Sequence, residues 1–354
     1  MNVIIIAGGT GGHVYPALSI AKKFKNQKNS IIWIGKEDSL ESRISSEEKF
    51  LFYPINGRGF LGKSFFGKII SLYFFVMAMI RSIFLFSKIQ PDIIVSTGGY
   101  VSFAPSLIGS LFCPLFIHEQ NSIAGLTNKI LHRFSRVTFE AFPGTFHKFS
   151  NKVICTGNPV RDDISKLADS NKTDQSIFKV LVLGGSQGSK QINDILTKVL
   201  TDNKIPNNWS FVHQSGKLDI SELESAYRKS CVEFEIRGYI KEMVEAYQNC
   251  DIIISRSGAM TISEICSARK PSILLPLPWS SDNHQYINAK YLHERGAAEI
   301  IESSVSNSVD LFKLLIELEK DHNRRESMMN SAANVFPKSA ADNIYKIINE
   351  SLKI

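Results

Sequence analysis

The chain has 354 residues, of which 44% are hydrophobic and 21% are charged, and this balance is typical of a folded protein long enough for two domains. The formal net charge of +7 favours an anionic partner, such as nucleic acid, an anionic membrane surface or a phosphorylated substrate. The five cysteines are scattered without a C-x-x-C pair, which indicates neither a disulfide framework nor a zinc site.

Short apolar runs are predicted to be the strands of the protein. Each run ends at turn residues, and helix-length segments separate the runs, which is typical of parallel strands buried on both faces. The predicted fold class is therefore α/β. The first run follows Met1 almost at once, without the basic and apolar segments of a secretory signal, so we expect a protein of the reducing cytosol. The runs lie at 2–9, 30–37, 91–99, 113–120, 179–186, 209–216, 250–258 and 271–278.

The first run leads into the glycine-rich sequence GGTGGH at 8–13. A turn of this kind between a buried strand and a helix brings backbone N–H groups and the positive end of a helix dipole to one point, which suits a phosphate. The dinucleotide fingerprint G-x-G-x-x-G is not matched, because its third glycine would fall at Val14. The alternative is that the glycines only permit a tight turn.

A second strand–loop–helix opening of the same type, VLVLGGSQGS, occupies 180–189. Two such openings predict two Rossmann-like doubly wound domains whose glycine loops lie on opposite walls of a central cleft. The segment CTGNPVRDDI between them marks a hinge. We expect one domain at 1–157, completed by a C-terminal helix at 338–354, and the other at 158–337. The two openings align with Gly9 on Gly185, Thr10 on Ser186 and Gly12 on Gly188.

The stretch at 60–89 is more apolar than a surface helix should be, and its only charges are cationic. Its longest charge-free run, Ile69–Ile80, is too short to span a bilayer. Apolar bulk with cationic interruptions is typical of a helix embedded in an anionic membrane interface. The alternative is a helix packed between the sheet and its neighbours. The residues expected at the membrane are Phe66, Ile70, Phe74 and Met77, with the cations Lys63, Lys68 and Arg81.

Eight motifs occur in the order, and at about the spacing, seen in one bacterial glycosyltransferase family. They are GGTGGHVYPAL, STGGYVSFAP, HEQNSIAGLTNK, TGNPVR, GGSQGS, GYIKEM, SRSGAMTISE and DNHQYINA. From Asn2 to about Ala298 the chain resembles the MurG family, whose members transfer N-acetylglucosamine from UDP-N-acetylglucosamine to the lipid-linked muramoyl-pentapeptide precursor of peptidoglycan.

The resemblance implies a GT-B type fold and an inverting, metal-independent transfer without a cofactor. It implies that the acceptor is the C4 hydroxyl of undecaprenyl-pyrophosphoryl-N-acetylmuramoyl-pentapeptide (lipid I) and that the product is lipid II. The N-terminal domain would face the acceptor and the membrane, and the C-terminal domain would bind the UDP-sugar. The protein would be peripheral at the cytoplasmic face of the cell (inner) membrane, with other cell-wall synthesis proteins as further partners and no nucleic acid.

The donor residues follow from the same resemblance. In SRSGAMTISE a glycine-containing turn precedes a helix, so the N–H groups near Met260 and Thr261 would point at the diphosphate. Glu264 would accept both ribose hydroxyls, and the alternative is a glutamate that only complements the helix dipole. Arg161 would supply a cation for phosphate, and Ile240 would meet uracil through its backbone and apolar side chain. The full donor set is Thr10, Gly11, Gly12, Asn121, Arg161, Ser186, Ile240, Ala259, Met260, Thr261, Glu264 and Gln285, with Asn121 and Gln285 on the sugar.

The loop GGTGGH and its partner STGGY would face the pyrophosphate of the acceptor. His13 has the chemical character of a general base near pH 7, so we predict that it takes the proton of the acceptor hydroxyl. The alternatives are that His13 caps the glycine loop or holds a phosphate. Glu119 is the second candidate for the base. The residues expected at the acceptor pyrophosphate are Gly9, Gly12, His13, Gly98, Gly99 and Tyr100.

Other functions share parts of this pattern. A UDP-N-acetylglucosamine 2-epimerase of the same fold would keep the nucleotide contacts but would need further acidic groups at the sugar. A non-catalytic, membrane-associated protein that binds UDP-sugar would lose the acceptor loops, which are intact here. An oxidoreductase is least favoured, because both glycine loops break the fingerprint and Glu37 and Asp38 are only loosely placed for a ribose contact.

Overall fold

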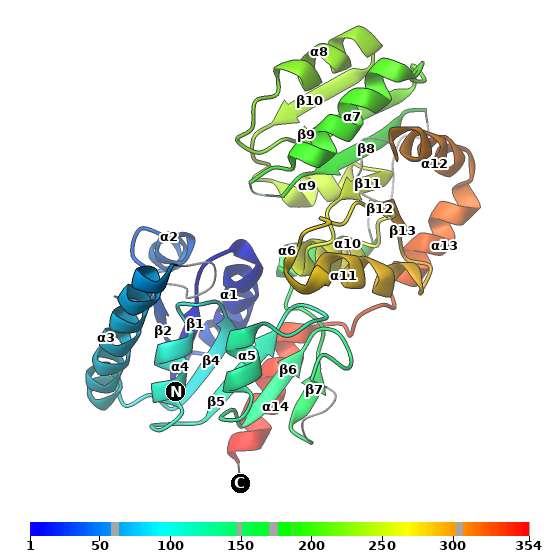
Figure 1. Ribbon diagram of the computed structural model, residues 1–354. Coiled ribbons are helices and arrows are strands. Elements are labelled where there is room, and N and C mark those ends of the chain that lie inside the picture. The colour runs from blue at the N-terminus through cyan, green and yellow to red at the C-terminus, as the bar shows by residue number, and fades with distance from the viewer. Residues whose placement is uncertain (58–63, 147–150, 170–175, 186, 302–306, 354) are drawn as a thin grey trace. The chain divides into compact units, whose positions relative to one another are not determined.

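The computed structural model describes residues 1–57, 64–146, 151–169, 176–185, 187–301 and 307–353. The chain forms two compact units (Figure 1). Unit 1 consists of Met1–Arg161 with Pro337–Ile354, and unit 2 of Asp162–Phe336. The change from one unit to the other falls inside the segment CTGNPVRDDI.

Unit 1 is built on a seven-stranded parallel sheet in the order β3-β2-β1-β4-β5-β6-β7. The apolar side chains of the central strands are buried on both faces, as a parallel sheet covered by helices requires. The strands are β1 (Asn2–Ala7), β2 (Ser30–Gly35), β3 (Leu51–Pro54), β4 (Ile93–Gly98), β5 (Leu115–Glu119), β6 (Val137–Glu140) and β7 (Val153–Cys155).

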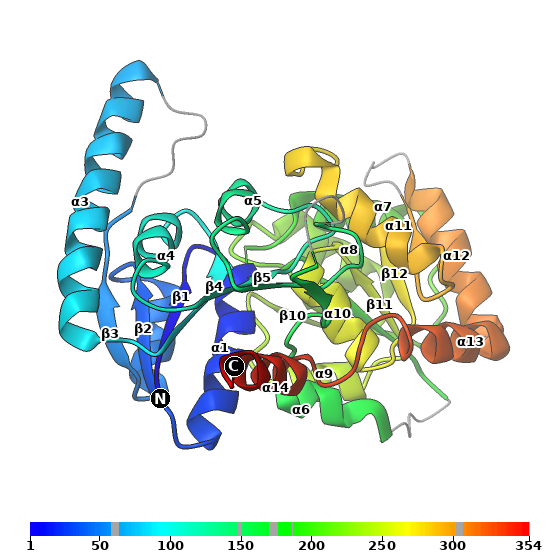
Figure 2. The ribbon, with the colours of Figure 1, turned by 90° about the horizontal axis from the view of Figure 1, so that it is seen from below.

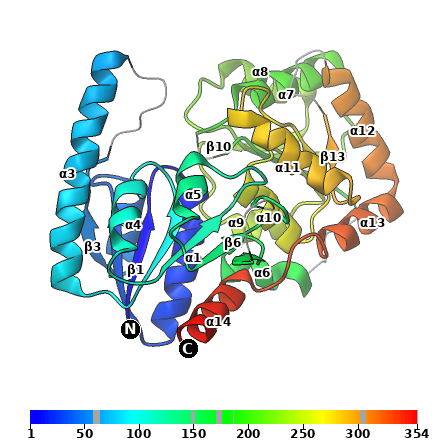
Figure 3. The same ribbon diagram turned by 60° about the horizontal axis from the view of Figure 1, so that its bottom comes forward.

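Helices cover both faces of this sheet (Figure 3). Because side chains alternate along a strand, Val3 and Ile5 of β1 pack with α1, α2 and α14, whereas Ile4 and Ile6 pack with α3, α4 and α5 on the opposite face. The helices are α1 (Gly11–Asn26), α2 (Leu40–Glu47), α3 (Phe65–Ile89), α4 (Phe103–Gly109), α5 (Leu126–Leu131) and α14 (Ala340–Leu352).

α14 returns the chain to unit 1 after unit 2 is complete. Its Ile344 and Ile348 are fully buried in the cluster that contains α1. Tyr345 packs edge-on against Phe24, with ring centroids 4.9 Å apart. α14 therefore completes the core on one face of the unit 1 sheet.

Unit 2 contains a six-stranded parallel sheet in the order β10-β9-β8-β11-β12-β13. On one face, buried side chains of α7, α8 and α12 pack around Val180 and Val182 of β8. The strands are β8 (Phe178–Leu183), β9 (Trp209–Gln214), β10 (Glu233–Arg237), β11 (Ile252–Ser255), β12 (Ser272–Leu274) and β13 (Glu299–Ile300). The helices are α6 (Asp162–Ser165), α7 (Lys190–Asp202), α8 (Ser221–Ser230), α9 (Met243–Gln248), α10 (Ala259–Ser267), α11 (His284–His293), α12 (Ser308–Lys320) and α13 (His322–Ala332), with 3-10 turns at Lys166–Asp169 and Ser281–Asn283.

All the predicted strands are present, and the prediction of two doubly wound α/β sheets is confirmed. The alignment of the two glycine loops holds only in part. Gly9 and Gly185 both have a positive φ, of 106° and 84°, which glycine adopts without strain. However, α1 begins at Gly11 whereas α7 begins only at Lys190, so Gly12 lies in a helix and Gly188 in a loop. The expected equivalence of Gly12 and Gly188 is wrong, because the loop of unit 2 is longer.

α3 carries a long row of exposed apolar side chains, here called the α3 apolar face. Its opposite side, which includes Ala78, Ser82 and Phe86, is buried in unit 1. Figure 2 shows its N-terminal part extending past the strands of unit 1. By length and composition, Ile69–Ile89 is apolar enough to cross a membrane, and the buried residues of this stretch are Ser71, Ala78, Ser82 and Phe86. The α3 apolar face consists of Phe66, Ile69, Ile70, Leu72, Tyr73, Val76, Ile80, Ile83 and Phe84.

The expected membrane residues are distributed around α3. Phe66 and Ile70 are exposed, and so is Arg81. Phe74 and Met77 are half-buried, because they lie at the border between the exposed and the packed sides of the helix. Lys63 and the side chain of Lys68 lie outside the described part of the chain.

Candidate active site

Each sheet has a switch point, where the strand order proceeds in opposite directions from the first strand. It lies between the carboxyl ends of β1 and β4 in unit 1, and between those of β8 and β11 in unit 2. Ligands of doubly wound sheets bind at such points. The loops that follow these strands carry the motifs GGTGGH, STGGY, GGSQGS and SRSGAM. We therefore describe two half-sites, one in each unit.

The glycine loops of unit 1 touch through their backbones. A side chain at Gly99 would place its Cβ 2.2 Å from the carbonyl oxygen of Gly8, and Gly99 has a φ of 92°. Only glycine is compatible with this contact. Gly98, with a φ of 93°, precedes it, and Tyr100 beside them is 45% exposed. The expected acceptor residues after β4 therefore lie against the loop after β1.

α1 starts in this loop and presents its N-terminus there. Thr10 is the N-cap residue, and its side chain makes no capping hydrogen bond. The first N–H groups of a helix, here at Gly11 and Gly12, have no acceptor within the helix. Together with the helix dipole they suit an anion.

His13 lies in the first turn of α1 and is half-buried. Its Nδ1 is 2.9 Å from the carbonyl oxygen of Thr97, and the Thr97 hydroxyl donates to the carbonyl of His13 at 2.8 Å. Because a carbonyl oxygen only accepts, Nδ1 carries the proton of the neutral ring and Nε2 carries the lone pair. A general base that acts through Nε2 needs this tautomer.

Glu119, the second candidate for the base, is 1% exposed at the end of β5. Its Oε1 accepts from the N–H of Asn121 at 3.1 Å and from the Asn121 side-chain amide at 3.4 Å. Its Oε2 accepts from the N–H of Gly125 at 3.1 Å and from Nδ2 of Asn128 at 2.9 Å. The carboxylate thus holds the loop at 120–125 in place through these bonds.

α10 begins beside the switch point of unit 2. Its N-cap residue Gly258 has no side chain and so makes no side-chain capping bond to the first turn at Ala259–Thr261. In the preceding loop, Nε of Arg256 donates to Oγ of Ser189 at 2.9 Å and so links this loop to the start of α7. Burial lowers the pKa of the Arg256 guanidinium from its ordinary value, although an arginine stays charged at neutral pH. A helix N-terminus and a cation therefore lie together, as binding of a diphosphate requires.

Glu264 lies one turn further along α10 and is half-buried. Its Oε2 accepts a hydrogen bond from the hydroxyl of the buried Tyr247 at 3.1 Å. This bond fixes the orientation of the carboxylate, which has further acceptor positions for the hydroxyls of a ribose.

Gln214, at the end of β9, joins two loops of the unit 2 half-site. Its Nε2 donates to the carbonyl of Gly185 at 2.8 Å, and its Oε1 accepts from the N–H of Ile240 at 3.3 Å. The side chain of Ile240 is fully buried. The apolar side chain that was expected to meet uracil is therefore buried within the protein, and the backbone N–H is bonded to Gln214. A contact of the Ile240 backbone with uracil stays a prediction.

Gln285, in the first turn of α11, lies beside the start of α10. Its Oε1 accepts from the N–H of Leu277 at 3.0 Å, and its carbonyl accepts from the hydroxyl of Ser257 at 2.7 Å. Arg161 is half-buried at the end of the first stretch of unit 1. Ser186 lies outside the residues that the structure describes. Among the described residues, no group of three or more His, Cys, Asp or Glu side chains is placed to hold a metal ion.

Domain models and whole proteins both match this chain. The glycosyltransferase family 28 N-terminal domain matches residues 3–139, and the C-terminal domain of the same family matches residues 179–344. The UDP-N-acetylglucosamine–N-acetylmuramyl-(pentapeptide) pyrophosphoryl-undecaprenol N-acetylglucosamine transferase of Coxiella burnetii (strain RSA 331 / Henzerling II) is 33% identical over 97% of this chain and 96% of its own. The transferase of the same name from Vesicomyosocius okutanii is 36% identical, also over 97% of this chain and 96% of its own. The chain belongs to the MurG family.

Solved structures agree with membership of the MurG family. The crystal structure of MurG from Acinetobacter baumannii has a TM-score of 0.81 and 28% identity, with 99% of both chains covered. The Staphylococcus aureus MnaA–UDP structure has a TM-score of 0.67 at 15% identity and so shares the fold alone. The predictions of the MurG family, the GT-B type fold and a glycosyltransferase are thereby confirmed.

The half-sites of this MurG family member also contain residues that we did not predict. Arg256 lies within the motif SRSGAMTISE, so it could have been predicted as a site residue from the sequence. Gln120, whose Oε1 lies 2.9 Å from Nδ1 of His13, also lies within a motif, HEQNSIAGLTNK. Gln214 and Tyr247 lie outside the motifs, and only their contacts in the folded chain reveal them.

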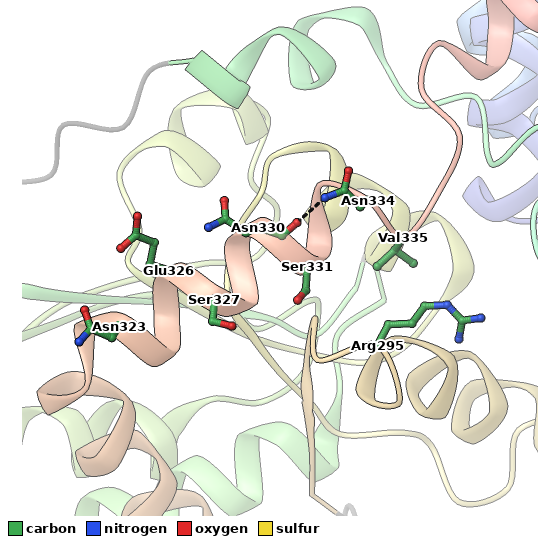
Figure 4. Close-up of a pocket in the computed structure, with 8 residues that line it drawn as sticks. All are labelled: Arg295, Asn323, Glu326, Ser327, Asn330, Ser331, Asn334 and Val335. Carbon is green, nitrogen blue, oxygen red and sulfur yellow. Dashed lines mark hydrogen bonds between the residues drawn. The ribbon is translucent and has the colours of Figure 1, made fainter.

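Unit 2 also contains a polar cavity that is lined by residues other than those of its half-site. Its volume is about 760 Å³, and it is lined by Arg295 at the end of α11 and by side chains on and just after α13 (Figure 4). Asn334 donates to the carbonyl of Asn330 at 2.9 Å along one side of it. None of the predicted site residues lines this cavity, so we do not assign it to the reaction.

Proposed function

We propose that this protein transfers N-acetylglucosamine from UDP-N-acetylglucosamine to the C4 hydroxyl of lipid I and so forms lipid II. The observation that carries the proposal is the identity of 33% and 36%, over 97% of the chain, to transferases whose name states this sugar and this acceptor. Unit 2 is assigned to the donor, and unit 1 to the acceptor and the membrane.

On the donor side, the leaving diphosphate gains negative charge as the bond to the sugar breaks. The N-terminus of α10 and the guanidinium groups of Arg161 and Arg256 offset this charge, so no metal ion is required. Glu264, oriented by Tyr247, accepts the ribose hydroxyls. Because Oε1 of Gln285 is already bonded within the protein, its Nε2 is assigned to the sugar together with Asn121.

On the acceptor side, Nε2 of His13 takes the proton of the C4 hydroxyl while the oxygen attacks the anomeric carbon of the donor sugar. The bond to the UDP oxygen breaks on the opposite face, which inverts the anomeric configuration. The carbonyl of Thr97, 2.9 Å from Nδ1, stabilises the imidazolium that forms. The N–H groups of Gly11 and Gly12 are assigned to the pyrophosphate of the acceptor.

A lipid-linked acceptor stays in the membrane, so its enzyme has to work at the membrane surface. The α3 apolar face is assigned to the interface of the cytoplasmic leaflet, with Arg81 and the neighbouring lysines on anionic headgroups. Phe86, near the C-terminal end of α3, is fully buried in unit 1. This attachment to the core supports a peripheral helix rather than a membrane-spanning one.

The test is incubation of the purified protein with radiolabelled UDP-N-acetylglucosamine and lipid I, followed by extraction of the lipid. We expect labelled lipid, formed equally well with EDTA present. A second incubation without lipid I should leave the nucleotide sugar unchanged. Conversion to the 2-epimer in that incubation, with no labelled lipid in the first, would contradict the proposal. Turnover abolished by EDTA and restored by magnesium or manganese would contradict the metal-independent mechanism.

A further inference from the structure

A line of hydrogen bonds connects His13 with the side chains of Gln120 and His118. Nδ1 of His13 is 2.9 Å from Oε1 of Gln120. Nε2 of Gln120 donates to the carbonyl of His118 at 2.9 Å and lies 3.1 Å from Nδ1 of His118. Nε2 of His118 is 3.0 Å from the carbonyl oxygen of Gly157. Gln120 and His118 are buried, with exposed fractions of 1% and 0%.

The carbonyl of Gly157 determines which atom donates and which accepts in each hydrogen bond of this line. A carbonyl oxygen only accepts, so Nε2 of His118 carries a proton and Nδ1 of the neutral ring carries a lone pair. Burial keeps this ring neutral at pH 7, since it lowers the pKa of His118 to about 4. The amide nitrogen of Gln120 must therefore face His118, and its oxygen faces Nδ1 of His13, which has to donate.

The other end of the line leads to the same assignment. The carbonyl of Thr97 also accepts from Nδ1 of His13. Two backbone carbonyls, 60 residues apart in the chain by their numbers 97 and 157, thus define one consistent set of protons. The segment that contributes Gly157 also holds the backbone of Gln120, because Nδ2 of Asn158 donates to the Gln120 carbonyl at 3.1 Å.

We propose that Gln120 and His118 are positioning residues that hold His13 in the tautomer with its lone pair on Nε2. The inference rests on the proposed role of His13 as the base. If the Gln120 amide turned over, it would present an N–H group to Nδ1 and favour the lone pair on the wrong nitrogen. His118 prevents this, because its own Nδ1 accepts from the amide.

The test compares Gln120→Met, which keeps the length of the side chain and removes the acceptor, with the wild-type protein. We expect kcat to fall about tenfold to a hundredfold, with the KM for the acceptor and the affinity for UDP nearly unchanged. Nitrogen NMR of His13 in the free enzyme should show the proton on Nδ1 in the wild type. In the variant the Thr97 carbonyl still accepts from Nδ1 but Gln120 Oε1 is gone, so a larger share of the ring should carry the proton on Nε2. The matched control is Gln27→Met at the exposed end of α1. This variant should keep both the wild-type kcat and the wild-type tautomer of His13.

A second variant separates positioning from packing. Gln120→Glu keeps an oxygen that accepts from Nδ1, so it should keep the wild-type tautomer and more turnover than Gln120→Met, even if both lower the thermal midpoint. A proton on Nε2 of His13 in the wild type, or an unchanged tautomer and kcat in Gln120→Met, would overturn the proposal. His13→Asn separates a failure of this inference from a failure of the proposed function. Full turnover in that variant would refute the role of His13 as the base. The NMR spectra of the wild type and Gln120→Met would still show whether Gln120 controls the tautomer of His13.

Discussion

The backbone of His13 is part of the motif GGTGGH, and its ring is the proposed general base. A substitution can separate a role in catalysis from a role in binding. His13→Asn keeps a polar side chain but removes the basic nitrogen, so we expect kcat to fall about a hundredfold or more. Donor affinity without acceptor should stay near the wild-type value. Steady-state kinetics beside calorimetric titration with UDP measures both quantities. A raised acceptor KM with intact saturated turnover would instead indicate that His13 holds a phosphate.

Glu264 is the second residue whose role can be isolated. Glu264→Ala removes charge-assisted hydrogen bonds to the ribose, so UDP should bind more weakly by about 1 to 3 kcal/mol. UDP and dTDP should also be distinguished less sharply, because the 2′-hydroxyl loses its acceptor. Tyr247→Phe removes the hydroxyl that donates to Glu264 at 3.1 Å but keeps the carboxylate, so it should have a smaller effect. An unchanged UDP affinity in calorimetry would remove Glu264 from the donor site.

At the scale of elements, α3 offers the sharpest contrast between membrane binding and internal packing. Changing Lys63, Lys68 and Arg81 together to Gln removes about 1 kcal/mol of attraction per cation on anionic lipid. The variant should therefore leave anionic vesicles at physiological salt. Its thermal midpoint and its turnover of a short-chain, water-soluble acceptor should stay nearly unchanged. Vesicle co-sedimentation beside a melting curve measures both effects.

A matched control removes the same charge from exposed lysines of unit 2. Lys198, Lys204 and Lys229 changed together to Gln give the same net charge, and this control should still sediment with the vesicles. If the α3 variant sediments as fully as the wild type, the interfacial role of α3 is wrong. If the unit 2 control is released equally, net charge rather than α3 governs the binding.

The strands divide into those that sequence can predict and those that it cannot. The central strands are unbroken apolar runs, because helices cover both of their faces. β10 was missed because it is an edge strand with alternating burial, and its sequence EFEIR reads as polar. β6 is buried but contains Thr138 and Glu140, whose polar atoms are bonded to His132 and to the N–H groups of Gly144 and Phe146.

The candidate site shows the same division. Glycine loops and helix starts are formed by residues that are close in sequence. The motifs GGTGGH and SRSGAM could therefore be assigned to the ends of strands from the sequence alone. The bond between Gln214 and Gly185 depends instead on strands that become neighbours only on folding. The contacts of Nδ1 of His13 likewise depend on residues distant in sequence, the carbonyl of Thr97 on the adjacent strand β4 and Oε1 of Gln120.

At the scale of the whole molecule, two buried histidines make stability depend on pH. Burial lowers the pKa of His118 to about 4 and that of His213 to about 3. In the unfolded chain both titrate near 6.5, so between about pH 6.5 and 4 the unfolded state binds more protons than the folded state. Stability should therefore fall as the pH is lowered through this window, by about 1.4 kcal/mol per pH unit for each histidine.

The contribution of one histidine can be isolated by comparing slopes. His213→Gln removes one of the two groups, and its free energy of unfolding should fall less steeply from pH 6.5 to 4 than that of the wild type. Above pH 7 the difference between the two proteins should be constant. Urea unfolding monitored at a series of pH values measures this, and equal slopes would show that His213 does not take up a proton on unfolding.

The return of α14 to unit 1 has a consequence for the way the protein is made. All residues of unit 2 are synthesised before the segment Ala340–Leu352. During that interval the α1 face of unit 1 lacks Ile344 and Ile348, and the apolar side chains that these residues cover, including Phe24, are open to water or to other nascent chains. Unit 2, by contrast, is continuous in sequence and can fold as soon as it emerges. The domain that begins the chain is thus the last to be finished.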